Sequence, residues 1–153
     1  MKLIPLLWLI LLSGCHSAPD ISPPPVSDEI NLQGKLPEDF DWPAYFDEGD
    51  QSVSSDMIHA QAATAVLKQR MDELCAQYRA LMAKRGETEA LKLFNEMQEH
   101  WQKSADAEVA FVGSPWDGGS GARAAYPMER FKVYLQRVKD LKELKNDSLF
   151  LNE

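Results

Sequence analysis

Apolar residues recur at alternating steps of three and four between residues 54 and 146, which is the spacing of one face of an α-helix. The first run follows Ser55 or Asp56, either of which can cap a helix N-terminus, and it stops at Gly86. With Thr64 as its one polar intruder, the run contains Met57, Ala60, Leu67, Met71, Leu74, Tyr78 and Leu81. This pattern predicts a long amphipathic helix.

Two further runs have the same period. The second extends from about Glu87 to Gly113-Ser114-Pro115, with inward positions Ala90, Phe94, Met97, Trp101, Ala105 and Val112. The third begins near Tyr126-Pro127, because proline suits a first helical turn, and reaches about Lys145 with inward positions Met128, Phe131, Leu135, Val138 and Leu141. No segment alternates convincingly at period two. The sequence therefore predicts an all-α fold, a small antiparallel three-helix domain with a glycine-rich loop between the second and third helices.

The N-terminus has the pattern of a secretory signal in residues 1–14. Lys2 precedes an apolar run of about ten residues, which is too short to span a hydrocarbon core of ~30 Å. The run ends in Leu12-Ser13-Gly14-Cys15, which resembles the lipobox of bacterial lipoproteins. In such proteins the signal is cut before the cysteine, so Cys15 would be the lipidated residue. The alternative is an ordinary secretory signal in which Cys15 is incidental.

A lipoprotein signal places the mature chain in the bacterial cell envelope. Two or more acyl chains would anchor it stably, since burial contributes about 0.8 kcal/mol per CH₂ and one chain alone binds only marginally. By resemblance to other lipoproteins, His16 is not the aspartate that accompanies retention at the inner membrane. We therefore expect an outer-membrane anchor facing the periplasm, in a host with two membranes.

Residues 15–53 show neither helical nor strand periodicity at their start and are rich in Pro, Ser and acidic residues. We expect a disordered, lipid-anchored tether here, a helical domain at 54–146 that folds without it, and a C-terminal tail at 147–153. Near the end of the tether the aromatic residues Phe40, Trp42, Tyr45 and Phe46 alternate with acidic ones. They either pack as an extended arm on the domain or form a partner-docking motif.

The chain of 153 residues carries a formal net charge of −8 with a pI of about 4.9. Such a surface repels phosphate backbones and anionic lipid headgroups, which excludes nucleic acid and leaves the lipid as the route to a membrane. Its long-range attraction favours a basic protein partner. The oligomeric state stays open.

A stretch in the C-terminal half resembles a known family. The pattern Gln-x-x-Trp is met by Gln98 and Trp101, the Asp-Ala-Glu step by Asp106-Ala107-Glu108, and the glycine-serine loop by Gly118-Gly119-Ser120. The helix end Arg-x-x-Glu-Leu is matched from Arg137 to Leu141, with Asp140 as the acid. Residues 95–145 are thus similar to the LprI-type lysozyme inhibitor family. The resemblance implies a non-enzymatic envelope protein that binds and inhibits lysozyme or a similar basic peptidoglycan hydrolase.

The chain departs from that family at its two cysteines. Val109 stands at the first position and Met128 at or beside the second, and both are apolar. A disulfide at these positions would contribute roughly 2–4 kcal/mol to the stability of the fold. We expect hydrophobic packing to take its place here. After Cys15 the remaining cysteine is Cys75, which is either a buried small hydrophobe or the site of an intermolecular disulfide.

Catalytic and metal sites find little support in the sequence, and we expect neither an enzyme nor a cofactor. Ser120 lies in a near match to a nucleophile elbow, but that motif ends in glycine where this chain has Ala122, and no histidine follows. Glu96 and His100 are one helical turn apart, yet a solvated helix face explains them better than a metal site. For Asp106 and Glu108 we expect capping, surface charge, or pairing with Arg130 or Arg137.

Trp116 lies in the glycine-rich loop between Pro115 and Asp117. Its ring either folds back to cap the core or serves as an interface anchor. Our hypothesis is that Trp116, Asp117 and the segment Gly118-Gly119-Ser120 form part of a lysozyme-facing surface, with Asp117 providing charge complementarity. The alternative function is a non-inhibitory envelope adaptor that binds another membrane-associated protein.

Overall fold

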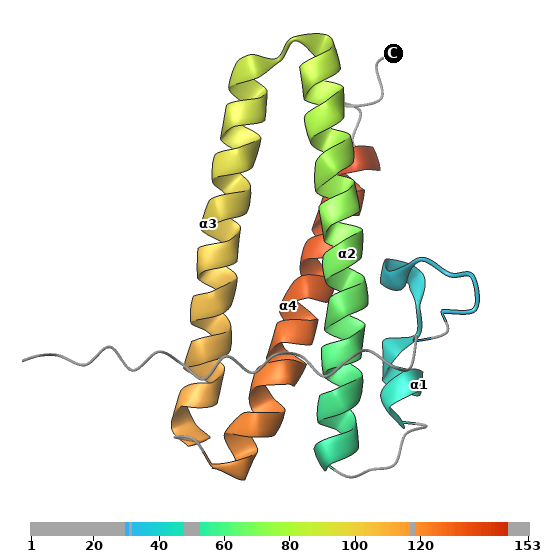
Figure 1. The fold of residues 1–153 in the computed structure, drawn as a ribbon, viewed down its shortest axis with the longest axis vertical. Coiled ribbons are helices and arrows are strands. Elements are labelled where there is room, and N and C mark those ends of the chain that lie inside the picture. Colours follow the sequence, from blue (N-terminus) through green and yellow to red (C-terminus); the bar gives the residue numbers. More distant parts are fainter. Residues whose placement is uncertain (1–29, 31, 48–52, 117–118, 147–153) are drawn as a thin grey trace, which may run out of the picture.

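The computed structural model describes residue 30 and residues 32–47, 53–116 and 119–146 (Figure 1). Three long helices dominate the described residues: α2 (Val53–Arg85), α3 (Thr88–Gly113) and α4 (Ser120–Asn146). The short elements are η1 (Pro37–Asp39), α1 (Trp42–Asp47) and η2 (Ser114–Trp116), and the described residues contain no strand. Figure 1 shows α2 joined to α3 at one end of the bundle and α3 joined to α4 at the other. The predicted all-α fold is confirmed.

Helix α2 follows its hydrophobic pattern closely. Ala60, Leu67, Met71, Leu74 and Tyr78 are all buried, and together with Cys75 and Met82 they form the centre of the core. The helix ends where glycine was expected to end it, because Gly86 adopts φ +72° and the Glu87 N–H donates to the Met82 carbonyl at 2.9 Å. A residue with a side chain would be strained at that φ.

Helix α4 begins earlier than its sequence indicated. It starts at Ser120, so Pro127 lies inside the helix and the expected start near Tyr126-Pro127 is wrong. An interior proline lacks the N–H that would bond the carbonyl four residues earlier, which normally disfavours such a position. Here the first turns are stabilised by packing, since Ala122 is buried. Tertiary contact therefore outweighs the local preference of proline for a helix start.

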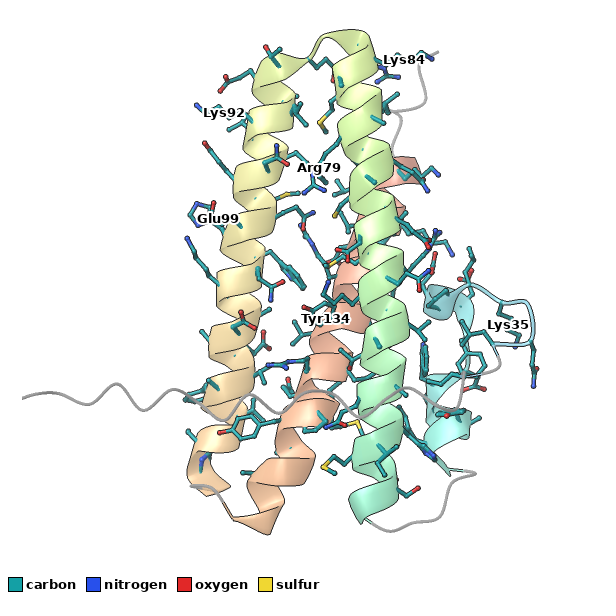
Figure 2. All side chains as sticks on the ribbon, in the orientation of Figure 1. Lys35, Arg79, Lys84, Lys92, Glu99 and Tyr134 are labelled. Atoms are coloured by element: carbon teal, nitrogen blue, oxygen red, sulfur yellow. The ribbon has the colours of Figure 1, made fainter. Side chains whose placement is uncertain are left out.

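The buried face of α3 differs slightly from the face that the sequence predicted. Four-residue steps connect its buried positions Ala105, Val109 and Gly113, with Phe94 further up the same face. Met97 lies at the edge of that face and is 37% exposed, so its predicted inward position is wrong, while Val112 and Trp101 are half-buried. In Figure 2, Lys92 and Glu99 point away from the bundle on the outer side of α3.

The N-terminal arm, residues 36–47, packs on the helices, as one of the two interpretations predicted. It is not extended, however, because Pro37–Asp39 and Trp42–Asp47 form short helices. Trp42 is only 2% exposed, and its ring contacts that of Phe131 in an edge-to-face arrangement with centroids 5.3 Å apart. The indole Nε1 of Trp42 donates to the Pro37 carbonyl at 2.7 Å. Packing therefore extends further toward the N-terminus than the expected domain start at residue 54.

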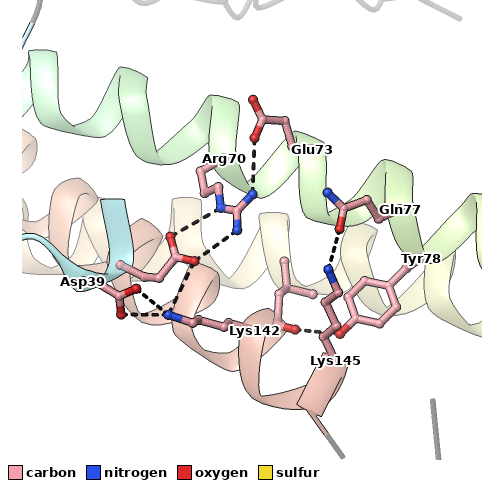
Figure 3. Close-up of polar contacts among 9 residues, drawn as sticks. Asp39, Arg70, Glu73, Gln77, Tyr78, Lys142 and Lys145 are labelled. Atoms are coloured by element: carbon pink, nitrogen blue, oxygen red, sulfur yellow. Dashed lines mark hydrogen bonds and ion pairs between the residues drawn. The ribbon is translucent and has the colours of Figure 1, made fainter. Parts of the chain in front are cut away.

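Charged contacts hold the arm in place (Figure 3). The Glu38 carboxylate, whose side chain is 1% exposed, accepts hydrogen bonds from Arg70 Nε at 3.3 Å and Nη2 at 3.2 Å. Lys142 of α4 donates to both carboxylate oxygens of Asp39 at 2.7 Å. Loss of Arg70 would therefore be costly, because it would leave the buried Glu38 charge uncompensated, whereas an exposed ion pair contributes little.

Candidate functional site

The predicted loop site is only partly within the described residues. The backbone of Trp116 ends η2, Gly119 is exposed, and Ser120 is the first residue of α4. Asp117, Gly118 and the side chains of Trp116 and Ser120 lie outside the described residues. The hypothesis that this loop faces a partner, and the alternative that Trp116 caps the core, both stay predictions.

The helix ends beside the loop are well defined. Gly113 is buried at the end of α3 against the ring of Tyr126, and a Cβ at residue 113 would overlap that ring. Phe111, by contrast, is 77% exposed. This end of the bundle thus combines a close helix approach with one large apolar side chain in solvent.

The family-matching residues Trp101 and Arg137 meet between α3 and α4. The Arg137 guanidinium lies over the Trp101 ring, with its carbon 5.3 Å from the ring centroid. Tyr134, which projects from α4 toward α3 in Figure 2, packs edge-to-face on the same Trp101 ring at 5.4 Å. Stacking of a guanidinium on an indole is favourable, and more so where water is excluded.

Arg137 is one of two charged residues that are buried among the described residues, and it is 8% exposed. Its Nε and Nη2 are shielded from solvent and donate to no acceptor in the described part of the chain. Burial lowers the pKa of the Arg137 guanidinium from its usual range, and the nearby Cys75 and Asp140 oppose that effect. Arg137 is thus a buried cation whose Nε and Nη2 have no acceptor among the described residues.

A shallow groove of about 320 Å³ opens beside this pair. Its lining consists of Trp101 and Glu108 of α3 and one face of α4 from Glu129 to Asp140, including Lys132 and Arg137. Glu129 and Lys132 form an ion pair at 3.3 Å, and Gln136 Nε2 donates to Asp140 at 2.8 Å. The groove therefore presents both acidic and basic groups around one aromatic ring.

The other family-matching residues have mixed surroundings. Asp106 is exposed and accepts hydrogen bonds from Gln102 Nε2 at 3.3 Å, which agrees with the surface-charge alternative and not with pairing to Arg130 or Arg137. Glu108 lies on the groove with Arg137. The Gln98 amide nitrogen is buried without an acceptor in the described residues.

Two apolar side chains turn inward where the resemblance described above implies cysteines, at Val109 and at or beside Met128. Val109 is 4% exposed, and Met128 is half-buried against the core cluster. Both side chains contribute to the packing, and the replacement of a disulfide by that packing stays a prediction. Cys75 is a free, buried thiol, which agrees with its interpretation as a small hydrophobic residue of the core. Burial raises the pKa of this thiol above its ordinary value.

The described residues show neither a metal cluster nor a membrane-spanning helix. Glu96 and His100 are both exposed on α3, and the described ranges contain no cluster of three acidic, His or Cys side chains that could hold a metal ion. Over the same ranges, no helix has the length and apolar character that a bilayer span requires.

Trp101, Glu108 and Arg137 were predicted from the sequence, whereas the groove that all three line was not. Lys132 and Glu129 were not singled out, because a charged pair on a helix face usually belongs to a solvated surface. The missed signal was the position of an arginine on the same face as Tyr134 and Leu141, which are otherwise core positions. An arginine in a core stripe indicates a buried charge.

The chain matches one family of known proteins. No curated protein and no solved structure matches the chain. A family model described as "Lysozyme inhibitor LprI" matches residues 48–141, which is more than half of the chain and includes the α3–α4 groove and the loop beside it. The chain therefore belongs to the LprI lysozyme inhibitor family.

Proposed function

We propose that this protein is a lipid-anchored envelope protein that binds lysozyme, or a similar basic peptidoglycan hydrolase, and inhibits it. The observation that carries the proposal is membership of a family described as lysozyme inhibitors. The formal charge of −8 supports it, because an acidic surface attracts a basic enzyme and accelerates encounter. An inhibitor family also agrees with the expectation that the chain is not an enzyme.

The envelope adaptor, our second candidate, loses one of its supports. That reading drew on the aromatic and acidic arm as a docking motif, but the arm's largest ring, Trp42, is 2% exposed and packs on Phe131. A side chain that fills the core is unavailable to a partner without partial unfolding. The adaptor therefore retains only the tether as its basis.

The direct test is a peptidoglycan clearing assay with the purified full chain. We expect the protein to slow the fall in turbidity that lysozyme causes, with saturation as its concentration rises. Because opposite charges promote encounter, the effect should weaken as salt is added. Clearing at the normal rate with the protein in large molar excess and at low salt would contradict the proposal.

The loop hypothesis needs its own variants. We expect Trp116→Ala and Asp117→Asn to weaken inhibition while leaving the melting temperature near that of wild type. Glu89→Gln is the matched control, since it removes one negative charge from an exposed position in the first turn of α3, at the far end from the loop (Figure 1). Trp116→Ala with a lowered melting temperature and normal inhibition by the folded fraction would assign Trp116 to the core.

A further inference from the structure

The outer side of α3 carries a stripe without acidic, lysine or arginine side chains. Its positions follow steps of four, three, four, three and four residues, and all of them are exposed: Leu93, Met97, His100, Ser104, Ala107 and Phe111. An α-helix makes about five turns in 18 residues, so Leu93 and Phe111 lie in line along the helix axis. We call these six residues the α3 stripe.

The α3 stripe is separate from the face that α3 packs on the bundle. That packed face contains the buried residues Ala105 and Val109, and its centre lies roughly 140° from the stripe around the helix. Figure 1 shows α2 and α4 on the same side of α3, and among the described residues no helix covers the other side. Large apolar side chains therefore stay in solvent, with exposed fractions of 54% at Leu93, 37% at Met97 and 77% at Phe111.

The alternation of three- and four-residue steps is the repeat by which two helices pack along a common seam. Single exposed apolar residues are usual on protein surfaces. A stripe that continues over five turns of one helix is different, because it keeps every Asp, Glu, Lys and Arg of α3 out of the seam. Such a surface is typical of an interaction with another helix.

The order of side chains in the α3 stripe fits a second copy that runs in the opposite direction. In a contact with two-fold symmetry, residue i of one copy meets residue j of the other and the reverse. With the axis near position 102, the pairs are Leu93 with Phe111, Met97 with Ala107, and His100 with Ser104. Large apolar side chains thus meet at both ends, and hydrogen-bonding groups meet at the centre. A parallel pair would instead place Ala107 against Ala107 and leave a gap.

The distribution of charge permits two bundles to associate. Residues 53–146 contain 14 Lys and Arg and 13 Asp and Glu, whereas residues 16–52 contain one lysine and nine acidic residues. The negative charge of the chain therefore lies almost entirely in the segment before the bundle. Two bundles do not repel each other, and a basic protein is attracted to the acidic segment rather than to the α3 stripe.

We propose that the protein forms a homodimer in which the α3 stripes of two copies pack antiparallel about an axis near position 102. Burial of both Phe111 rings removes the most apolar surface, since each is 77% exposed in one copy. A seam of five turns buries on the order of 1,000 Å² in total, at the lower end of specific interfaces. The dimer is therefore reversible, with a Kd in the micromolar range.

The first test is sedimentation equilibrium of the full chain in a thiol reductant, which excludes disulfide-linked pairs. We expect the mass to rise with concentration from that of one 17.3 kDa chain to that of two. Because the contact is apolar, added salt should not weaken it. A mass of one chain at about 1 mM, where even weak specific contacts are populated, would overturn the proposal. Dissociation by salt would also overturn it, because that would indicate an ionic contact.

A charge placed in the α3 stripe should prevent dimer formation. Ala107→Glu adds a carboxylate that the second copy would have to bury, so we expect the Kd to rise at least about tenfold. The melting temperature of the dilute protein should stay near that of wild type, because Ala107 is exposed within one copy. Ala65→Glu is the matched control, at an exposed position of α2. Dimer formation by Ala107→Glu with the wild-type Kd would overturn the proposal.

A double-mutant cycle tests the antiparallel register. Leu93 and Phe111 are about 27 Å apart on one helix, so they interact only across copies. Leu93→Ala and Phe111→Ala should each raise the Kd several-fold, and the double variant should raise it by less than the product of the two effects. Ile58→Ala is the control, because this α2 residue is 51% exposed, close to the 54% of Leu93. Effects that multiply would overturn the proposed register.

Other occupants of the α3 stripe give different results. A monomeric chain in which Ala107→Glu lowers the melting temperature would assign the stripe to another segment of the same chain. A monomeric chain in which Ala107→Glu loses only lysozyme inhibition would assign it to that enzyme. Either result overturns the dimer. The proposal does not depend on the proposed inhibition, because the sedimentation experiments contain no lysozyme.

Discussion

Replacing Trp42 by alanine tests whether the N-terminal arm belongs to the cooperative fold. The ring is 2% exposed and meets Phe40, Tyr45 and Phe131 edge-to-face at 4.8, 6.1 and 5.3 Å. Truncating a buried aromatic to alanine costs about 3–5 kcal/mol. The lost bond to the Pro37 carbonyl, 2.7 Å long, adds roughly 1 kcal/mol. The sum is a large part of the 5–15 kcal/mol that is usual for a domain.

The assay is thermal unfolding followed by circular dichroism at a helix band. Since 1 kcal/mol shifts the melting temperature of a small domain by several degrees, Trp42→Ala should lower it by at least about 10 °C. Leu36→Ala is the matched control, because this arm residue is 44% exposed and should matter little. A shift of less than about 2 °C in Trp42→Ala would refute the reasoning and make the arm an independent appendage.

A chain that begins at residue 54 lacks the whole N-terminal arm. The sequence led us to expect that residues 54–146 fold without the preceding segment. In the structure, that truncation removes Trp42 from the core and Glu38 from Arg70. We therefore expect the truncated chain to melt well below the full chain, and equal melting temperatures would restore the original expectation.

Three further predictions concern single side chains. Tyr78→Phe should lower the free energy of unfolding by about 1 kcal/mol in urea titrations, because the Tyr78 hydroxyl donates to the Leu141 carbonyl at 2.6 Å; an unchanged midpoint would contradict that role. Burial raises the pKa of the Cys75 thiol, so the unfolded chain loses this proton first and stability falls as pH rises above about 8.5. The free energy of unfolding of Cys75→Ala should fall less steeply over that pH range. Parallel curves of unfolding free energy against pH for the variant and wild type would disprove the linkage. Because Leu12-Ser13-Gly14 precedes Cys15, Cys15→Ser should abolish lipid labelling and membrane retention, and undiminished labelling would exclude the lipoprotein signal.

Features that depend on neighbours along the chain were readable from the sequence. The period of apolar residues placed α2, and Gly86 marked its end because only a short-range requirement, φ +72°, decides that position. The match of Gln98, Trp101 and Arg137 to a family pattern was likewise local, and the family assignment is confirmed. The signal pattern before Cys15 and the loop around Asp117 stay predictions.

Features that depend on residues far apart in the chain were decided by the tertiary structure alone. Pro127 suggested a helix start, but the burial of Ala122 extends α4 to Ser120. The arm shows no clear periodicity in the sequence. Its contacts, Trp42 with Phe131 and Glu38 with Arg70, form only when the helices pack together. The charge of Arg137 was visible in the sequence, whereas its burial over Trp101 and its unused donors were not. Local periodicity fixes which face of a helix is apolar, but the desolvation of one side chain depends on every element that packs around it.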